Sequence, residues 1–257
     1  MKVLKLLIVA SNFLFSQMLC FLLSLRNFNR KKVLVYTDSR GFKVEELFHN
    51  RNPFSSYVGK LILDYNVTFR LMPFKHTTIV DFIFDFDNKW SGSEFDFVIL
   101  HCGIVDFSPR TKSSVPFIQQ RKISKIPPEF HELFKSFPCY DVEYKNELTA
   151  SLYSKDFLKD FIIPKLTSIN GLIFIEPNRI CNDWNGSYPN SRPDNMNLIF
   201  EYVKLISDKV DNVIPLSLLD ENEVRNITTD NVHYNNYGFD YIYDSVKRIV
   251  DDSKENN

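Results

Sequence analysis

The sequence contains 257 residues, of which 44% are hydrophobic, which is enough to form one sizeable core in a single α/β domain. The 31 basic and 32 acidic residues leave a net charge of −1. No long basic block is present to neutralise a phosphate backbone, so nucleic acid is excluded as an expected partner. The four cysteines are scattered and include no CxxC pair, so we expect neither a metal site nor a disulfide framework.

The N-terminal segment is apolar. Residues 6–25 carry no charge and are flanked on both sides by basic residues, and twenty apolar residues suffice to cross a bilayer as a helix. No small-x-small cleavage site follows, which favours an uncleaved anchor over a removed signal peptide. We predict an apolar helix within residues 1–31 and membrane association through residues 6–25. The alternative is a cytoplasmic protein whose N-terminal helix packs on the domain.

Strands and helices alternate along the rest of the chain. Short apolar runs predict strands at residues 33–37, 66–71, 95–101, 171–176 and 212–216. Helical patterns predict helices soon after Gly41 and at residues 79–86, 151–169, 193–209 (with Pro193 in the first turn) and 235–250.

This alternation predicts a parallel sheet covered by helices on both faces, with ligands bound beyond the carboxyl ends of the strands. We assign residues 32–251 to one catalytic domain and residues 252–257 to a polar tail. The proline-rich segment 107–150 is an insertion within the domain, and an insertion of this size is more often a lid or binding wall than an idle loop.

The first polar motif, Asp38-Ser39-Arg40-Gly41, follows the first predicted strand. A serine on a tight strand-to-helix turn exposes its hydroxyl and places its own N–H where it can stabilise an oxyanion. A serine after a strand is also a common helix cap. The motif alone leaves both roles open.

The second motif, Asp230-Asn231-Val232-His233, precedes the last predicted helix. An aspartate three residues before a histidine can bind Nδ1 of the imidazole and hold Nε2 as a general base facing a nucleophile. An aspartate that caps a helix, beside an ordinary histidine, is the alternative.

The third motif, Gly103-Ile104-Val105-Asp106, follows the third predicted strand. Gly103 permits a sharp turn that brings backbone close to a substrate, and Asp106 can fix the loop by accepting backbone hydrogen bonds. A plain strand-ending turn is the alternative.

In order and context the three motifs resemble the blocks of the SGNH hydrolase superfamily, also called GDSL esterases and lipases. Thr37-Asp38-Ser39 resembles the Gly-Asp-Ser block, residues 103–106 resemble the Gly-x-Asn-Asp block, and residues 230–233 match the Asp-x-x-His block in full. The resemblance covers about residues 32–250. It implies a three-layer α/β/α flavodoxin-like fold, with a five-stranded parallel sheet in the order 2-1-3-4-5 after the apolar N-terminal helix.

The resemblance also implies the chemistry. Ser39 would be the nucleophile, His233 the general base and Asp230 the residue that orients the imidazole, without a metal or cofactor.

The sequence departs from the family at the oxyanion hole. Val105 occupies the position of the family's asparagine, and the region of the second block, residues 74–79, has no glycine. Loss of one oxyanion donor typically costs about 3 kcal/mol of transition-state stabilisation. By location, the candidate oxyanion or substrate-binding residues are Ser39, Gly103, His76, Thr77, His101, Asp106 and Arg110.

These features together predict a serine esterase that hydrolyses a small acyl ester. Similarity to members associated with bacterial surface polysaccharides suggests an O-acetyl group on a carbohydrate, with Tyr140, Trp184 and Tyr188 as candidates for stacking on sugar rings. Two alternatives stay open. One is an acyltransferase that passes the acyl group to a polysaccharide, and the other is a catalytically weakened, glycan-binding protein of the same fold.

Overall fold

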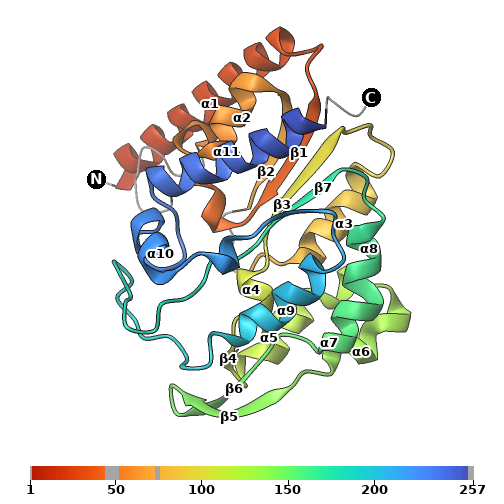
Figure 1. Ribbon diagram of the computed structural model, residues 1–257, viewed down its shortest axis with the longest axis vertical. Helices are drawn as coiled ribbons and strands as arrows, with labels where there is room; N and C mark the ends of the chain where they lie inside the picture. The colour runs from red at the N-terminus through yellow and green to blue at the C-terminus, as the bar shows by residue number, and fades with distance from the viewer. Residues whose placement is uncertain (1, 44–51, 73–75, 254–257) are drawn as a thin grey trace.

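The computed structural model describes residues 2–43, 52–72 and 76–253. At its centre is a five-stranded sheet (Figure 1) made of β1 (Lys32–Thr37), β2 (Asn66–Leu71), β3 (Phe97–His101), β7 (Leu172–Ile175) and β8 (Asn212–Ile214). All neighbouring pairs are parallel, and the order across the sheet is β2-β1-β3-β7-β8. Counted along the chain this is the order 2-1-3-4-5, so the predicted fold is confirmed.

Helices cover both faces of the sheet, because successive strand residues point to opposite sides. In β1, Val33 and Val35 join the core under one helical layer, while Leu34 and Tyr36 join the core under the other. The first layer contains α1 (Lys2–Arg26), α2 (Tyr57–Asp64), α10 (Glu221–Ile227) and α11 (Asn236–Asp252). The second contains α3 (Ile79–Lys89), α4 (Ile104–Phe107), α7 (Lys155–Phe157), α8 (Ile163–Thr167) and α9 (Leu198–Ser207).

Several helices differ from their predicted limits. The predicted helix 151–169 is α7 and α8 joined by a π-helical turn, Leu158–Ile162. The widened turn ends two residues before Pro164, which has no N–H to donate within the helix. The helix predicted soon after Gly41 falls largely on residues 44–51, outside the described residues, and α2 was not recognised as a separate element.

The prediction that Pro193 lies in the first turn of a helix is wrong, because α9 begins at Leu198. The preceding residues form turns with i to i+3 hydrogen bonds, such as that from the N–H of Leu198 to the carbonyl of Asn195. The Asn195 side chain donates to Thr149 Oγ1 at 2.9 Å, so the insertion holds this segment away from a helical path.

The segment predicted as an insertion contains a small antiparallel sheet in the order β4-β6-β5. Its strands are β4 (Arg110–Thr111), β5 (Cys139–Tyr144) and β6 (Glu147–Ala150), with α5 (Ser114–Gln120) and α6 (His131–Lys135) between β4 and β5. Lys145 and Asn146 join β5 to β6 with φ values of 55° and 62°. Two successive residues of positive φ are typical of a tight hairpin turn.

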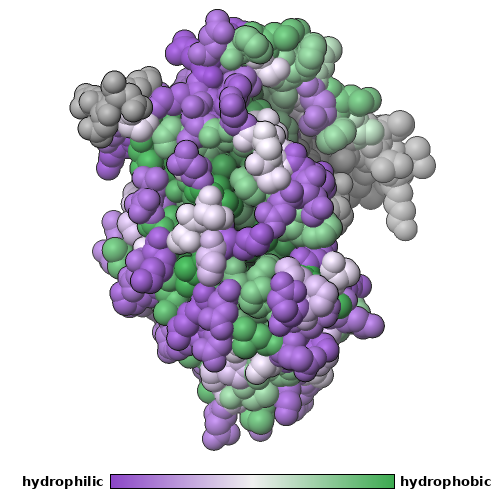
Figure 2. All heavy atoms as spheres, turned by 90° about the vertical axis from the view of Figure 1, so that its right-hand side faces the viewer, coloured by the Kyte–Doolittle hydropathy of each residue, from purple (hydrophilic) through white to green (hydrophobic). Residues whose placement is uncertain are grey.

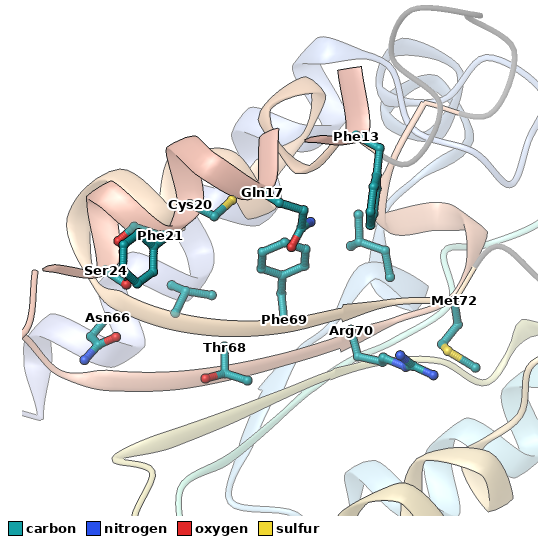
Figure 3. Close-up of a pocket in the computed structure, with 12 residues that line it drawn as sticks. Phe13, Gln17, Cys20, Phe21, Ser24, Asn66, Thr68, Phe69, Arg70 and Met72 are labelled. Carbon is teal, nitrogen blue, oxygen red and sulfur yellow. Dashed lines mark hydrogen bonds between the residues drawn. The ribbon is translucent and has the colours of Figure 1, made fainter. Parts of the chain in front are cut away.

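Helix α1 lies over the edge strand β2 (Figure 1). Asn27, just after α1, donates to the carbonyls of Ile62 and Tyr65 at 2.9 and 3.1 Å, which ties this end of the helix to α2. A groove of about 680 Å³ runs between α1 and β2, and Phe13, Gln17 and Phe21 line it from the helix (Figure 3).

Helix α1 exposes several large apolar side chains, of which Phe13 and Phe21 face the groove. Its side chains with half or more of their surface exposed are Phe13, Leu14, Phe15, Met18, Phe21, Leu22 and Leu25. By contrast, hydrophilic and hydrophobic residues are interspersed over the face shown in Figure 2. None of the helices in the described part of the chain has both the length and the apolar character that crossing a membrane requires. The predicted membrane anchor is therefore not supported.

Candidate active site

Ser39, His233 and Asp230 meet at the carboxyl edge of the sheet. Ser39 Oγ lies 3.0 Å from His233 Nε2, and His233 Nδ1 lies 2.8 Å from Asp230 Oδ2. One ring nitrogen thus faces a hydroxyl and the other a carboxylate, an arrangement in which the imidazole can accept the hydroxyl proton. The structure brings together the three residues that the sequence motifs singled out, across a separation of 194 residues between Ser39 and His233.

The turn that carries Ser39 is held by Asp38 and Arg40. Asp38 Oδ1 accepts from the N–H of Arg40 at 3.0 Å and caps the short 3-10 turn Ser39–Gly41. The fully buried Arg40 guanidinium also pairs with this carboxylate, with Nη2 3.0 Å from Oδ2. The cap is therefore Asp38 rather than Ser39, which leaves the Ser39 hydroxyl directed at His233.

Gly41 is required by the same turn. A Cβ atom at this position would lie 2.1 Å from Thr37 Oγ1, well inside van der Waals contact. The turn therefore folds back onto the end of β1 only because residue 41 has no side chain.

Hydrogen bonds within the loop before α11 fix Asp230 against His233. Asp230 Oδ1 accepts from the N–H groups of Val232 and His233 at 3.0 and 2.6 Å, while Oδ2 binds the imidazole. Burial acts to raise the pKa of the Asp230 carboxyl, but its hydrogen bonds to His233 and the charge of that ring hold the pKa below its usual value. Asp230 is thus kept as an ionised acceptor for Nδ1.

The side chain of Asn231 fixes this loop through hydrogen bonds, a role that was not identified from the sequence. Asn231 is fully buried with φ 70°, a left-handed conformation that asparagine tolerates better than most residues. Its Oδ1 accepts from the N–H of Cys181 at 3.0 Å, and its Nδ2 donates to the carbonyls of Cys181 and Trp184 at 2.8 and 2.7 Å. The loop after β7 therefore fixes the loop that carries the histidine.

Replacing Asn231 with alanine should destabilise the protein, because it leaves two buried backbone groups and one partly buried backbone group without these partners. At about 1 kcal/mol or more for each group, we expect a loss of roughly 3 kcal/mol in the free energy of unfolding. Urea denaturation measures it, with the exposed Asn222→Ala as the matched control. Equal stabilities of the two variants would contradict this role of Asn231.

Gly103 lies beside Ser39 at the strand ends. Thr37 of β1 pairs with His101 of β3, so Ser39 and Gly103 each follow neighbouring strands by two residues. Gly103 has φ 124°, which L side chains rarely adopt. None of the hydrogen bonds between described residues uses the N–H of Ser39 or Gly103. Two backbone donors are thus available at the end of the sheet, next to the hydroxyl.

Asp106 is fully buried beneath this edge. Its Oδ1 accepts from the N–H of Ile79 at 3.0 Å and from the Tyr153 hydroxyl at 2.8 Å, so it joins the third motif to the start of α3. Its Oδ2 has no hydrogen-bond partner among the described residues. Burial raises the pKa of the Asp106 carboxyl to about 7.

The raised pKa predicts a pH-dependent contribution to stability. Because the folded-state pKa lies above the unfolded value, the contribution of Asp106 is complete at acidic pH and is lost as the pH rises towards 7 and above. Asp106→Asn keeps an acceptor for Ile79 and Tyr153 but cannot ionise. Between pH 5 and pH 7 the wild-type protein should therefore lose stability relative to the variant, by up to about 1.4 kcal/mol per pH unit.

Urea denaturation of both proteins at pH 5, 6, 7 and 8 measures this difference. The exposed Asp240→Asn serves as a control, for which no such trend is expected. Stability curves of wild type and Asp106→Asn that run parallel over this range would show that Asp106 does not titrate there.

The other residues predicted to bind the oxyanion or the substrate include His101, His76 and Thr77. His101 is fully buried, with Nδ1 3.0 Å from the Tyr57 hydroxyl, and burial holds its pKa well below the usual value. It therefore supports the site from beneath in its neutral form. His76 (φ 69°) and Thr77 come just before α3. Residues 73–75, which include part of the second block, lie outside the described residues.

A pocket of about 270 Å³ opens beside the imidazole. His233, Arg110 and Arg192 line it together with Tyr144 and Tyr188. Of the three aromatic residues proposed to stack on sugars, Tyr188 lines this pocket, whereas Tyr140 and Trp184 do not. Arg192 and Tyr144 belong to no motif in the sequence. They were not identified from the sequence because only the fold brings them close to His233.

Comparison with known proteins adds fold-level similarity. No family model matches the sequence. An uncharacterised protein, L829, of Acanthamoeba polyphaga mimivirus is 31% identical over 114 residues, which is 42% of this chain and 24% of that protein. The matched region thus spans about a quarter of that relative.

Similar solved structures include lipases and an acetylxylan esterase. A lipase/acylhydrolase from Enterococcus faecalis is 15% identical, with 86% of this chain and 95% of that chain covered and a TM-score of 0.49. A catalytic mutant of an acetylxylan esterase from Geobacillus stearothermophilus is 15% identical, with 86% and 94% covered and a TM-score of 0.44. A GDSL-like lipase from Bacteroides thetaiotaomicron is 11% identical, with 88% and 90% covered and a TM-score of 0.47. These similarities concern the fold.

Proposed function

We propose that this chain is a serine esterase of the SGNH type that hydrolyses a small acyl ester. The observation that carries the proposal is the hydrogen-bonded series from Ser39 through His233 to Asp230, at 3.0 and 2.8 Å. The strand order and the position of this series at the carboxyl edge of the sheet agree with it. A protein that only bound glycans would not need all three groups in this geometry.

In the proposed acylation step, His233 Nε2 takes the proton of the Ser39 hydroxyl while Oγ forms a bond to the acyl carbon. The carbonyl oxygen becomes an oxyanion and accepts hydrogen bonds from the N–H groups of Ser39 and Gly103. The bond from the acyl carbon to the alcohol oxygen then breaks, and His233 returns the proton to that oxygen. Asp230 holds the charged imidazole in place throughout.

Water completes the cycle by the same route. His233 takes a proton from water as the water oxygen attacks the acyl carbon, and it then returns the proton to Ser39 Oγ as the acid leaves. If an alcohol replaces water at this step, the same residues perform acyl transfer. Adding an acceptor alcohol and analysing the products therefore separates esterase from acyltransferase.

The oxyanion hole is the weak part of the proposed machinery. Val105 cannot supply the side-chain donor that the resemblance implies, which leaves the two backbone donors. A missing donor lowers kcat by about 10²–10³-fold in other hydrolases. We therefore expect slow turnover of simple esters.

Ser39→Ala should reduce kcat/KM for p-nitrophenyl acetate by at least about 10³-fold, because triad residues act as one unit. Asp230→Asn and His233→Gln should produce losses of similar size for the same reason. Ser93→Ala, an exposed serine before β3, is the matched control and should retain the wild-type rate. Wild-type turnover by Ser39→Ala would remove serine catalysis from the account.

As the natural substrate we propose an O-acetyl group on a carbohydrate, for which Tyr188 offers an aromatic face in the pocket. Acetate release from acetylated oligosaccharides, compared with p-nitrophenyl acetate, tests this part. A lower kcat/KM on every acetylated sugar than on the simple ester would argue against a carbohydrate substrate.

Membrane association through residues 6–25 stays a prediction. The exposed apolar side chains of α1, such as Leu14, Met18 and Leu25, favour contact with a lipid surface rather than passage through it. Co-sedimentation with anionic vesicles tests it, and protein that stays in the supernatant would contradict it.

A further inference from the structure

Two arginines line the pocket beside His233 with only neutral acceptors. Arg192 donates to Asn185 Oδ1 at 3.1 Å and to the main-chain oxygen of Asp230 at 2.5 Å, and its guanidinium lies 4.3 Å from the centre of the Tyr188 ring. Arg110 donates to the main-chain oxygen of Val105. Its Nε atom is buried and has no hydrogen-bond partner among the described residues.

The nearby carboxylates offset only part of the charge of these arginines; Asp230 lines the same pocket, and its charge acts on Arg192. Asp230 is already bound by His233 and by two backbone N–H groups. Asp106 is the acid that acts on Arg110, but its ordered contacts are to Ile79 and Tyr153, and burial raises its pKa to about 7. Burial also lowers the pKa of the Arg110 guanidinium to about 10, so both arginines stay charged at neutral pH. The pocket lining therefore carries two guanidinium groups against the one carboxylate of Asp230, which leaves an excess of positive charge.

The position of the pocket beside His233 indicates that it binds the alcohol part of the ester. His233 lines it and is the group that protonates the leaving oxygen, so the alcohol part of the ester is released on this side. Tyr144 of the insertion lines the pocket and donates its hydroxyl to the main-chain oxygen of Ser191, another lining residue, at 2.9 Å. The insertion thus helps to form the site for the alcohol.

We infer that the alcohol part of the substrate carries an anionic group, a carboxylate or a phosphate, that Arg110 and Arg192 bind in this pocket. Guanidinium groups form strong, charge-assisted hydrogen bonds with both kinds of oxyanion. Both arginines line the pocket, which places two guanidinium groups around the same oxyanion. The inference rests on the proposed esterase function and narrows its substrate to an acidic ester, such as an acetylated acidic sugar.

The test compares phenyl acetates that differ in the charge of one substituent. The probes are 4-acetoxybenzoate, its neutral counterpart 4-acetoxybenzamide, and 4-acetoxyphenyl phosphate. A charge-assisted hydrogen bond to the pocket should raise kcat/KM for at least one anionic probe about tenfold or more over the amide. Whether the carboxylate or the phosphate is preferred identifies the oxyanion.

The ratio of kcat/KM for the anionic probe to kcat/KM for the amide should fall towards one in Arg110→Gln and in Arg192→Gln. The same ratio should decrease with added salt. Arg248→Gln, an exposed arginine on α11, is the matched control and should keep the wild-type preference. A wild-type preference near one or below, or an equal preference in the two pocket variants, would overturn the inference.

A separate measurement keeps this result distinct from failure of the esterase function. If no probe is hydrolysed, the rate at which a fluorophosphonate labels the protein can be followed with added 4-hydroxybenzoate or 4-hydroxybenzamide. Stronger protection by the benzoate would support the anion site without turnover, whereas equal protection would contradict it.

Discussion

The ion pair between Asp38 and Arg40 is the interaction on which the candidate site depends. The two side chains flank Ser39, are almost completely buried, and make three hydrogen bonds between them at 3.0–3.2 Å, in addition to the bond from the Arg40 N–H. Removing either partner would leave a buried charge uncompensated, which typically destabilises a protein by about 3–5 kcal/mol. The same ion pair therefore stabilises the domain and fixes the position of the Ser39 hydroxyl.

His233 is positioned by the loop before α11. Asn231 joins the loop that carries His233 to the loop after β7. Tyr234, which follows His233, lies close enough to Arg40 for the guanidinium charge to act on its hydroxyl. Ser39 and His233 are therefore both held by buried side chains, although no backbone hydrogen bond between the described residues joins their two motifs. This explains how loops so far apart in sequence bring Oγ and Nε2 to 3.0 Å. Arg192, which binds the main chain of Asp230, extends these contacts to the pocket wall.

The sequence predicted the sheet and singled out Ser39, Asp230 and His233, which the structure brings into contact, because both predictions follow local rules. The strand at residues 66–71 has its predicted limits, and the motifs fall at strand ends, where a parallel sheet gathers polar residues. The hairpin of β5 and β6 was not predicted, because its alternating exposed residues lie in a proline-rich segment and its turn uses Lys145 and Asn146 rather than glycine. The positions of Arg110 and Arg192 in one pocket depend on that insertion and on the loop before α9, which no local pattern encodes.

The most direct measurement of the central claim is the site of covalent modification by a fluorophosphonate, determined by peptide mapping and mass spectrometry. The account predicts a single adduct on Ser39 and a much slower reaction in His233→Gln, because the imidazole must accept the hydroxyl proton. An adduct on another residue, or labelling of Ser39 at an unchanged rate without the histidine, would contradict it.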